Sequence, residues 1–441
     1  MNVLHKRSLS KGLLTWAVAA ACLPQVASAG LFDVYGFGAR ATAMGNAHCA
    51  ASEDYTAVFY NPGALTVHGK PHVGTGLNVV VPSLYVDRQQ SGADAPLTEL
   101  PESNVGVNLG LLFPLGGLIE NRLALGVGLY VPTIQVTRVD AVDVQTPHFH
   151  RYDALTDKLV MAAGLAYRVH DRVSIGVGGQ LLGTLTGKAT ATLDPLGRRF
   201  LRRDLAVDLE TASAPIAGVL VQPADDWRLG FSYRGALSLD YSLSTDLTIQ
   251  GAGRMVAVVE GQALWTPPTY TWGASWKHQS LSATADLVWS RWSLSPDPSA
   301  SFNLLLDGEP IDKGSVDVGA TPVDLGAKDT LDVRLGMEWR PNDFWALRGG
   351  YGFHPTPLPQ QTQAPNYIDS AAHQIGLGFG YTFPDPLAMH RSPITLDLSI
   401  QGTFLTDREM RKAEGVASSV GSYTAGGQIW HMALQFRHDF D

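Results

Sequence analysis

Apolar residues alternate with small or polar residues along most of the chain from about residue 70 to the end. The alternation is clearest in residues 105–111, 375–381 and 396–400, where one face is apolar and the other carries glycine, asparagine, serine or aspartate. A period of two is typical of β-strands, because successive side chains point to opposite faces of a sheet. The pattern therefore predicts an all-β fold.

The strand predicted at 333–339 distinguishes between two kinds of all-β protein. Its apolar face is formed by valine, leucine, methionine and tryptophan. Its opposite face carries four charged residues: Asp332, Arg334, Glu338 and Arg340. That set is too charged for the interior of a small soluble sandwich, whereas a membrane barrel with a polar lumen and an apolar exterior accommodates both faces.

The connections between predicted strands alternate between short and long. Six short turns are predicted at 114–121, 170–172, 223–226, 278–280, 341–343 and 384–392. Seven long polar connections are predicted near 87–102, 137–154, 191–203, 243–261, 294–327, 355–370 and 406–425. They separate fourteen antiparallel strands, and one long connection has room for a further strand pair. An even count puts both termini on the short-turn side, as in outer-membrane barrels.

Aromatic residues recur near the predicted strand ends, where barrels carry girdles at the membrane interfaces. The tryptophans among them are Trp227, Trp272, Trp276, Trp289, Trp292, Trp339 and Trp345. We expect these side chains to face lipid headgroups. Core packing in a soluble sandwich is the alternative interpretation.

The first 29 residues have the organisation of an export signal. Lys6, Arg7 and Lys11 precede an apolar run at 12–23, and Ala27-Ser28-Ala29 is a small-x-small cleavage site. The apolar run is too short for a membrane-spanning helix. We expect residues 1–29 to be removed and the mature chain to be exported. Cys22 leaves a lipoprotein signal as a less favoured alternative.

Charge and cysteine content exclude several classes of partner and fold. Removal of the signal changes the formal net charge from −9 to −12, because residues 1–29 hold three basic and no acidic side chains. Nucleic acid is therefore not an expected partner. Only Cys49 remains after the signal, so no internal disulfide is expected, and this cysteine is predicted to be a small buried filler. No apolar run of 18 residues follows the signal, which excludes a helical membrane protein.

Residues 30–70 do not alternate and are predicted to form a separate unit ahead of the barrel at 71–441. Residues 36–47 are rich in glycine and alanine, which suit tight turns and one short helix. About forty residues cannot build a substantial core of their own. We therefore expect this segment to pack inside the lumen of the fourteen-stranded barrel as a plug.

The predicted plug resembles a known family. Gly38-Ala39-Arg40-Ala41-Thr42-Ala43-Met44-Gly45, followed by residues 54–62, is similar to the N-terminal hatch of FadL/TodX-type outer-membrane transporters. Segments 164–169 and 332–351 are also similar to the family, so the resemblance covers the whole mature chain. One departure is Asn61-Pro62-Gly63, where the family usually has alanine after Asn-Pro. Glycine keeps the position small but adds chain entropy of roughly 0.5–1 kcal/mol.

The resemblance implies passive transport of long-chain fatty acids or other hydrophobic compounds, gated by movement of the plug. It implies that a plug tail reaches the ligand pocket, with Leu31, Phe32, Val34, Tyr35 and Phe37 as the tail residues. Simple packing of the plug is the alternative role for these side chains. The residues of the plug motif are Arg40, Phe59, Tyr60, Asn61, Pro62 and Gly63.

The resemblance also implies sideways release of the ligand through an interrupted third strand. Pro132 interrupts the strand predicted at 123–136, and proline removes a ladder hydrogen bond, so it is the candidate for a lateral opening. The alternative is a strand that ends there. A ligand carboxylate needs a basic partner, for which Arg40, Arg334 and Arg348 are candidates.

Other chemistries have weak signals. Gly36-Phe37-Gly38-Ala39-Arg40-Ala41 matches a dinucleotide fingerprint, but it follows an export signal rather than a strand of a βαβ unit. His148 and His150 are too few for a metal site and are expected to be solvated loop residues. We predict a protein that is not an enzyme, holds no cofactor or metal, and acts as a monomer in outer-membrane lipid. A general porin and an adhesive or structural barrel are the competing functions.

Overall fold

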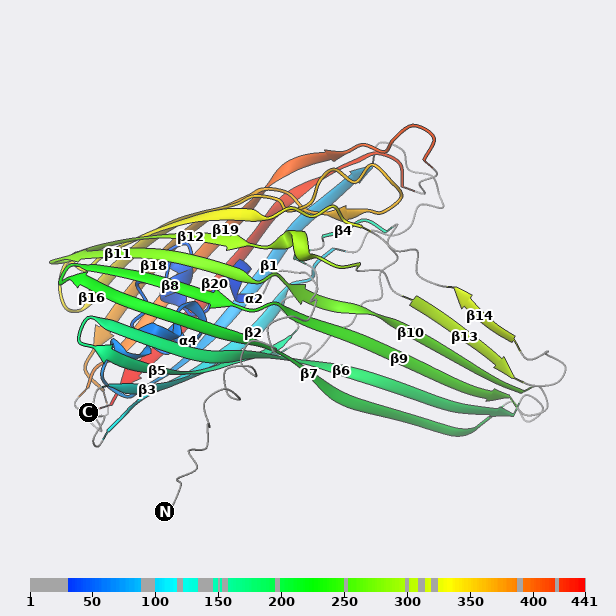
Figure 1. The fold of residues 1–441 in the computed structure, drawn as a ribbon, viewed down its shortest axis with the longest axis horizontal. Helices are drawn as coiled ribbons and strands as arrows, with labels where there is room; N and C mark the ends of the chain where they lie inside the picture. Colours follow the sequence, from blue (N-terminus) through cyan, green and yellow to red (C-terminus); the bar gives the residue numbers. More distant parts are fainter. Residues whose placement is uncertain are drawn as a thin grey trace, which may run out of the picture.

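Fourteen strands form a closed antiparallel barrel in the computed structural model (Figure 1). The structure describes residues 31–88, 100–116, 122–133, 146–149, 151–152, 158–194, 199–249, 253–297, 301–307, 314–318, 324–386, 392–416 and 420–440. The predicted signal, residues 1–29, lies outside these ranges. Among the described residues, no helix combines the length and apolar character needed to cross a membrane.

The barrel strands follow one another in chain order. They are β1 (His72–Arg88), β2 (Asn104–Leu115), β3 (Leu123–Pro132), β5 (Leu159–His170), β6 (Val173–Asp194), β7 (Arg199–Ala224), β8 (Trp227–Arg234), β11 (Thr269–His278), β12 (Leu281–Ser290), β15 (Thr330–Trp339), β16 (Trp345–His354), β18 (Ala372–Phe383), β19 (Ile394–Met410) and β20 (Tyr423–Asp439). Strand β1 closes the ring by pairing with β20 over its whole length, from His72↔Asp439 to Arg88↔Tyr423. Closure removes the free edges that an open sheet would present. The predicted count of fourteen is confirmed.

The two faces of the barrel wall differ as the alternation predicts. In β15, Leu331, Leu335 and Met337 are exposed on the outside, whereas Arg334 and Glu338 are buried on the inside. Polar or charged residues are buried at inward positions of other strands too: Asn78, Asn108, Gln180, Asp286, Arg348, Gln374, Asp397, Gln401, His431 and Gln435. The outer surface is apolar and the lumen is polar.

Two of the predicted long connections contain strand pairs. The connection from β8 to β11 contains β9 (Leu237–Ile249) and β10 (Gly253–Thr266), and the connection from β12 to β15 contains β13 (Ser301–Asp307) and β14 (Gly314–Val318). Their sheet continues the ends of β6 and β7 beyond the barrel (Figure 1). The predicted loops near 191–203, 243–261 and 294–327 were therefore too long. Residues 243–249 continue the alternation of apolar and polar side chains that begins at Leu237, but their polarity favoured a loop assignment from 243 onward.

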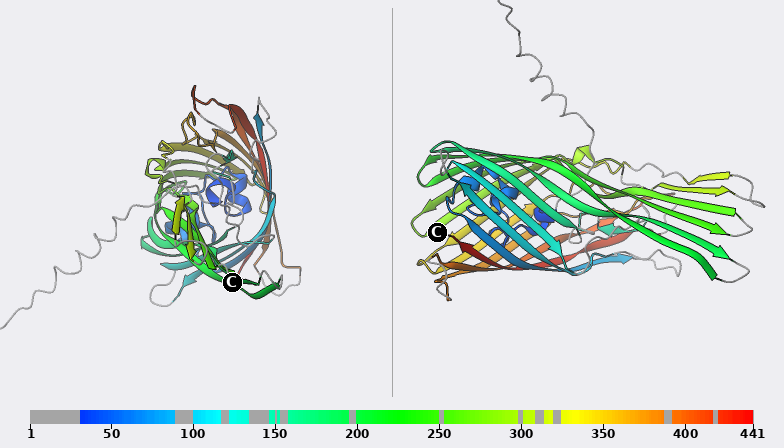
Figure 2. Two further views of the ribbon diagram at one scale, coloured as in Figure 1. Left: turned by 90° about the vertical axis from the view of Figure 1, so that its right-hand side faces the viewer. Right: turned by 90° about the horizontal axis from the view of Figure 1, so that it is seen from below.

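Four short helices lie inside the barrel, ahead of β1 (Figure 2). They are α2 (Leu31–Tyr35), α3 (Ala39–Ala43), α4 (Ala57–Tyr60) and η2 (Pro62–Thr66). We call residues 31–70 the plug. Helix α3 packs on β16, β18, β19 and β20, and η2 packs on β3, β5, β6 and β7, so the plug contacts opposite sides of the wall.

Inward-facing glycines on the strands mark where the plug backbone touches the wall. A Cβ atom added at Gly350 would lie 2.1 Å from Gly45 N, one at Gly176 would lie 2.3 Å from the carbonyl carbon of Pro62, and one at Gly376 would lie 2.5 Å from Thr42 O. Other strand glycines whose Cβ would clash with the plug are Gly74, Gly110, Gly126, Gly128, Gly218, Gly230, Gly273, Gly336 and Gly378. A Cβ would overlap plug backbone at some of these positions and plug side chains such as Tyr55, Phe37 and Leu65 at others, so glycine leaves the space that the plug occupies.

This contact predicts a difference between two adjacent glycines of β16. Gly350→Val should push the plug away from the wall and expose Cys49, which is buried and is the only cysteine after the predicted signal. Gly349→Val is the matched control, since a Cβ there meets no described atom within 4 Å. The rate of maleimide labelling of the folded protein measures the effect. Equal labelling rates for the two variants would contradict the assignment of Gly350 as a plug contact.

Candidate functional site

The Asn61 side chain fixes the turn that ends α4. Its Nδ2 donates to Cys49 O and to Val219 O, both at 3.0 Å, and its Oδ1 accepts from Gly63 N at 3.0 Å. One amide thus closes the turn, joins two parts of the plug and binds strand β7. A Cβ at Gly63 would lie 3.1 Å from Gly218 O, which explains why glycine suits this position.

Polar side chains of the wall accept hydrogen bonds from the plug backbone. Asp286 Oδ2 accepts from His48 N at 2.7 Å and from Cys49 N at 2.9 Å. Gln435 Oε1 accepts from Ala39 N at 2.7 Å. Buried backbone N–H groups need such partners because water cannot reach them. The polar lumen therefore replaces the solvent that the irregular plug backbone would otherwise require.

A buried ionic layer fixes the central part of the plug. Arg40 Nε lies 2.9 Å from Glu338 Oε2, and Arg348 Nε lies 2.6 Å from the same oxygen. Arg348 Nη1 also lies 2.5 Å from Asp397 Oδ1. Arg40 and Arg348, two of the predicted carboxylate partners, are thus paired with carboxylates of the barrel itself.

Glu53 extends this layer toward the short-turn end of the barrel. Arg228 Nη1 lies 2.8 Å and Arg40 Nη1 lies 3.6 Å from the Glu53 carboxylate. Burial alone would raise the pKa of the Glu53 carboxyl, but Arg40, Arg228 and Lys277 outweigh it and lower the pKa to about 2. A carboxyl with a lowered pKa stabilises the fold at neutral pH, and this stabilisation is lost as the pH falls from about 4.5 toward 2.

Helix α2, at the start of the plug, is held by a second and smaller set of charges. The Asp33 carboxylate contacts Arg234 Nη2 and lies 4.0 Å from Arg334 Nη2. The Arg234 guanidinium also lies over the Phe59 ring, 4.1 Å from its centroid. Arg334, the third predicted carboxylate partner, is the one that reaches α2, and its Nε has no hydrogen-bond partner among the described residues.

A cavity of about 490 Å³, partly open to solvent, lies beside α2. Its lining includes Asp33, Val34, Arg334, Trp292 and Thr403. The lining also includes the ionisable residues Arg151, Asp332 and His354, and its apolar and aromatic part is formed by Val34, Tyr152, Pro267 and Trp292. This combination suits a ligand with an apolar chain and one polar end.

Aromatic rings surround α2 on its other side. The Phe32 ring lies 4.4 Å from Phe37, 5.0 Å from Phe59 and 6.1 Å from Tyr130, measured between centroids. Phe32 and Tyr130, with residues of β1, β2 and β20, line a second cavity of about 230 Å³. Phe32, Val34, Tyr35 and Phe37 are all buried, whereas the side chain of Leu31 lies outside the described part of the chain.

Pro132 is the last residue of β3 and pairs with Gly106 of β2. The register between β2 and β3 runs without a shift from Leu115↔Leu123 to this pair. Pairing with β5 stops two residues earlier, at Tyr130↔Val160. Pro132 therefore lies where β3 loses one of its two neighbours.

Trp292 and His148 do not lie where the sequence analysis placed them. Trp292 is 3% exposed and packs edge-on against Trp265 at 6.0 Å, so it covers the lumen rather than facing lipid. His148 is buried where β4 (His148–Phe149) pairs in parallel with β17 (Tyr367–Ile368). Both elements belong to connections that fold inward over the plug, which a local sequence pattern does not reveal.

Comparison with known proteins identifies the family to which this barrel belongs. The family model described as outer membrane protein transport protein (OMPP1/FadL/TodX) matches residues 20–440. The chain belongs to the FadL/TodX family. Alkane uptake protein A of Marinobacter nauticus is 26% identical over 402 residues, which cover 86% of this chain and 84% of that protein.

Solved structures share the fold. A FadL homologue of Pseudomonas aeruginosa has a TM-score of 0.58 at 16% identity and covers 95% of this chain and 99% of its own. The toluene transporter TbuX of Ralstonia pickettii has a TM-score of 0.56 at 18% identity and covers 93% of this chain and 100% of its own. The chain is therefore an outer-membrane β-barrel of a family that transports hydrophobic compounds rather than catalysing reactions.

In this FadL/TodX barrel, several residues that hold the plug carried no recognisable signal in the sequence. Asp33, Arg234, Glu338 and Asp397 lie far apart in the chain and meet only when the barrel closes. The charged inner face of the strand at 333–339 was the one available hint. It indicated a polar lumen but not the plug residues that neutralise it.

The ionic layer gives a prediction for Glu338→Gln. The change leaves Arg40 and Arg348 without their shared carboxylate in a buried site, which costs about 3–5 kcal/mol in comparable cases. We expect the plug amides around residues 39–44 to exchange hydrogen much faster, as measured by hydrogen–deuterium exchange. Glu409→Gln is the control, because its partner Arg411 is on the surface, where solvent screening leaves such pairs with little effect on stability. Similar plug exchange in both variants would refute a structural role for the layer.

Proposed function

We propose that this protein carries long-chain aliphatic molecules, fatty acids and alkanes, passively across the outer membrane. The observation that carries the proposal is the closed barrel whose plug leaves a cavity beside α2. Each CH₂ group removed from water contributes about 0.8 kcal/mol, so an alkyl chain can be captured without an energy source. The name of the Marinobacter relative, an alkane uptake protein, supports an aliphatic substrate.

Gating in this proposal is movement of α2, the tail of the plug. The central plug is fixed by buried ion pairs and by the Asn61 turn. Helix α2 has only five residues and is anchored through Asp33, whose side chain is 19% exposed, and through hydrogen bonds from Gln374 and Gln401 to Val34 O. A ligand that enters the cavity would displace α2 and leave the rest of the plug in place.

The Asp33 site supports a specific exchange, in which the carboxylate of an acidic ligand takes the place of the Asp33 carboxylate. Arg334 is buried and lines the cavity, Arg234 is buried behind Asp33, and the Asp33 carboxylate contacts Arg234 and lies 4.0 Å from Arg334. A fatty-acid carboxylate has the same charge and shape, so it can replace Asp33 without leaving either guanidinium unpaired. An alkane must instead displace α2 by apolar contacts alone.

Release is proposed to occur sideways, where β3 loses pairing beyond Tyr130. Tyr130 lines the second cavity, and Pro132 is buried two residues further along the same face of the strand. Proline cannot donate a ladder hydrogen bond, so this part of the wall costs less to separate than a fully paired strand. The ligand would leave the lumen there and enter outer-membrane lipid. The protein is proposed to be exported by the signal at 1–29 and to act as a monomer, since one chain encloses the whole pathway.

Uptake by a strain from which the gene has been deleted tests the function. Complementation with the intact chain should restore uptake of dodecanoic acid or dodecane, and sugars should not swell liposomes that contain the protein. Sugar-driven swelling would favour a general porin. Unchanged uptake of all hydrophobic substrates, with swelling also absent, would favour an adhesive or structural barrel.

The Asp33 exchange predicts an effect that depends on the ligand head group. Asp33→Asn removes the competing charge, so we expect dodecanoate to bind roughly tenfold more tightly or better, since a hydrogen bond to a charged group contributes about 1.5–3 kcal/mol. Dodecanol, with the same chain and no charge, is the matched ligand. Isothermal titration calorimetry measures the affinities for dodecanoate and dodecanol, in a detergent whose structure does not resemble either ligand. An equal gain for dodecanol would show that the variant only loosens α2.

A further inference from the structure

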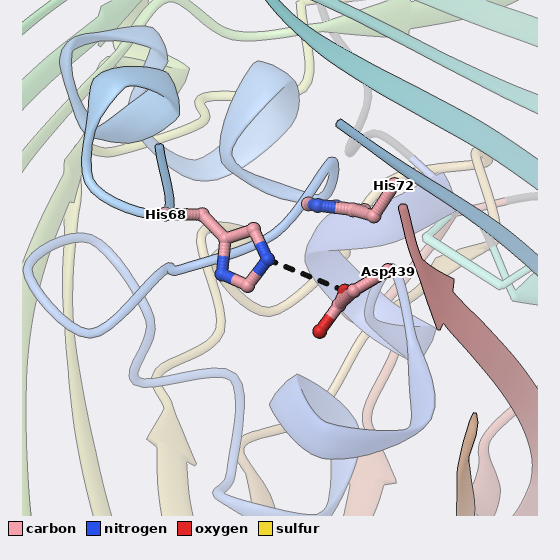
Figure 3. A group of neighbouring side chains, drawn as sticks. All are labelled: His68, His72 and Asp439. Carbon is pink, nitrogen blue, oxygen red and sulfur yellow. Dashed lines mark ion pairs between the residues drawn. The ribbon is translucent and has the colours of Figure 1, made fainter. Parts of the chain in front are cut away.

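Three metal-ligating side chains meet where the plug joins the barrel (Figure 3). His68 follows the last helix of the plug, His72 is the first residue of β1, and Asp439 is the last residue of β20. His72 and Asp439 are direct partners in the pairing that closes the barrel. The cluster therefore connects the end of the plug to both strands of the closing seam.

The donor atoms of the cluster point toward one another. One possible ligand atom from each residue lies within 4.8 Å of the other two, and His68 Nε2 lies 3.2 Å from Asp439 Oδ1. Two donors bound at about 2.0–2.2 Å in a tetrahedral site are separated by roughly 3.3 Å, so the His68–Asp439 pair already has the required spacing. The donor atom of His72 must move slightly closer to the other two to complete the ligand set.

These atoms also lack other hydrogen-bond partners. Outside the cluster, His68 Nε2, His72 Nδ1 and Asp439 Oδ1 have no hydrogen-bond partner among the described residues, and His72 is 1% exposed. Buried polar atoms without partners are uncommon in folded proteins, and a bound ion is one feature that satisfies them. Arg437 Nε, 3.6 Å from Asp439 Oδ1, is the one basic group of the described residues that competes for this carboxylate.

We propose that His68, His72 and Asp439 bind one divalent transition-metal ion. Two imidazoles and one carboxylate form a ligand set that suits Zn²⁺, Ni²⁺, Cu²⁺ or Co²⁺ and leaves a position for water. Mg²⁺ and Ca²⁺ prefer sites made of oxygen atoms alone, so they are not the expected ions. The spacing His68-x-x-x-His72 is visible in the sequence, but Asp439 joins it only through barrel closure.

Metal binding changes one contact of the plug. His72 Nε2 accepts a hydrogen bond from Tyr55 N at 2.8 Å, which places the ring proton on Nδ1. A metal at Nδ1 moves this proton to Nε2, where it would face the Tyr55 N–H, so the Tyr55 amide loses its acceptor and the two donors must move apart. The ion therefore replaces one hydrogen bond within the plug-to-β1 junction by a link between His68 and both closing strands.

Titration of the untagged, chelator-treated full-length protein with Zn²⁺ and Co²⁺ tests the proposal. We expect one ion per chain, a tetrahedral Co²⁺ absorption band, and a higher thermal unfolding temperature with Zn²⁺ than without it. Mg²⁺ at the same concentration should have none of these effects. Absence of binding by the folded wild-type protein would overturn the proposal.

Two variants assign the site. His68→Ala should lose the Co²⁺ band and the Zn²⁺-dependent thermal shift, because His68 lies outside the strands and its removal leaves the seam paired. His373→Ala is the matched control, since His373 is on the outer face of β18 and outside the cluster. Heat-modifiability on gels checks that both variants are folded. Retention of stoichiometric binding by folded His68→Ala protein would place the ion elsewhere and refute the assignment.

Discussion

Inward-facing glycines let the plug backbone lie directly against the barrel wall, and this fit determines what else the lumen can contain. A Cβ at Gly350, Gly176 or Gly376 would overlap plug backbone atoms. With the plug so close, its N–H groups reach wall side chains such as Asp286 and Gln435. Cavities remain beside α2, and another lies near Arg40, Glu53 and Lys277 toward the short-turn end of the barrel.

The plug is anchored unevenly along its length. Its centre is held by the buried arginines Arg40 and Arg348 on shared carboxylates, and breaking such pairs costs several kcal/mol. Its first helix is held by the Asp33 ion pair, by hydrogen bonds to Val34 O and by packing of Phe32, at the edge of a cavity that opens to solvent. A segment with weaker anchors opens more readily than the core around it. This difference is the basis for the proposal that the tail responds to a ligand while the centre of the plug stays in place.

Strand number, the positions of turns and the presence of a plug could be predicted because each depends on local patterns. The six short turns predicted from the sequence all lie between paired barrel strands, as in 170–172 between β5 and β6. The sheet formed by β9, β10, β13 and β14 was missed because its polar residues favour loops locally, and its alternating residues such as 237–249 find their pairing partners only beyond the barrel. The Asp33–Arg234 and Glu338–Arg348 contacts could not be predicted, since they depend on which inward positions meet after closure.

A structure determined with dodecanoic acid bound would test most directly whether the plug tail and the ligand share one site. We expect the alkyl chain in the cavity beside α2, the carboxylate on Arg234 and Arg334, and Asp33 displaced. Arg40 and Arg348 should remain paired with Glu338. A ligand bound while Asp33 keeps its arginine contacts, or a plug that leaves the barrel as a whole, would refute a shared site for the tail and the ligand.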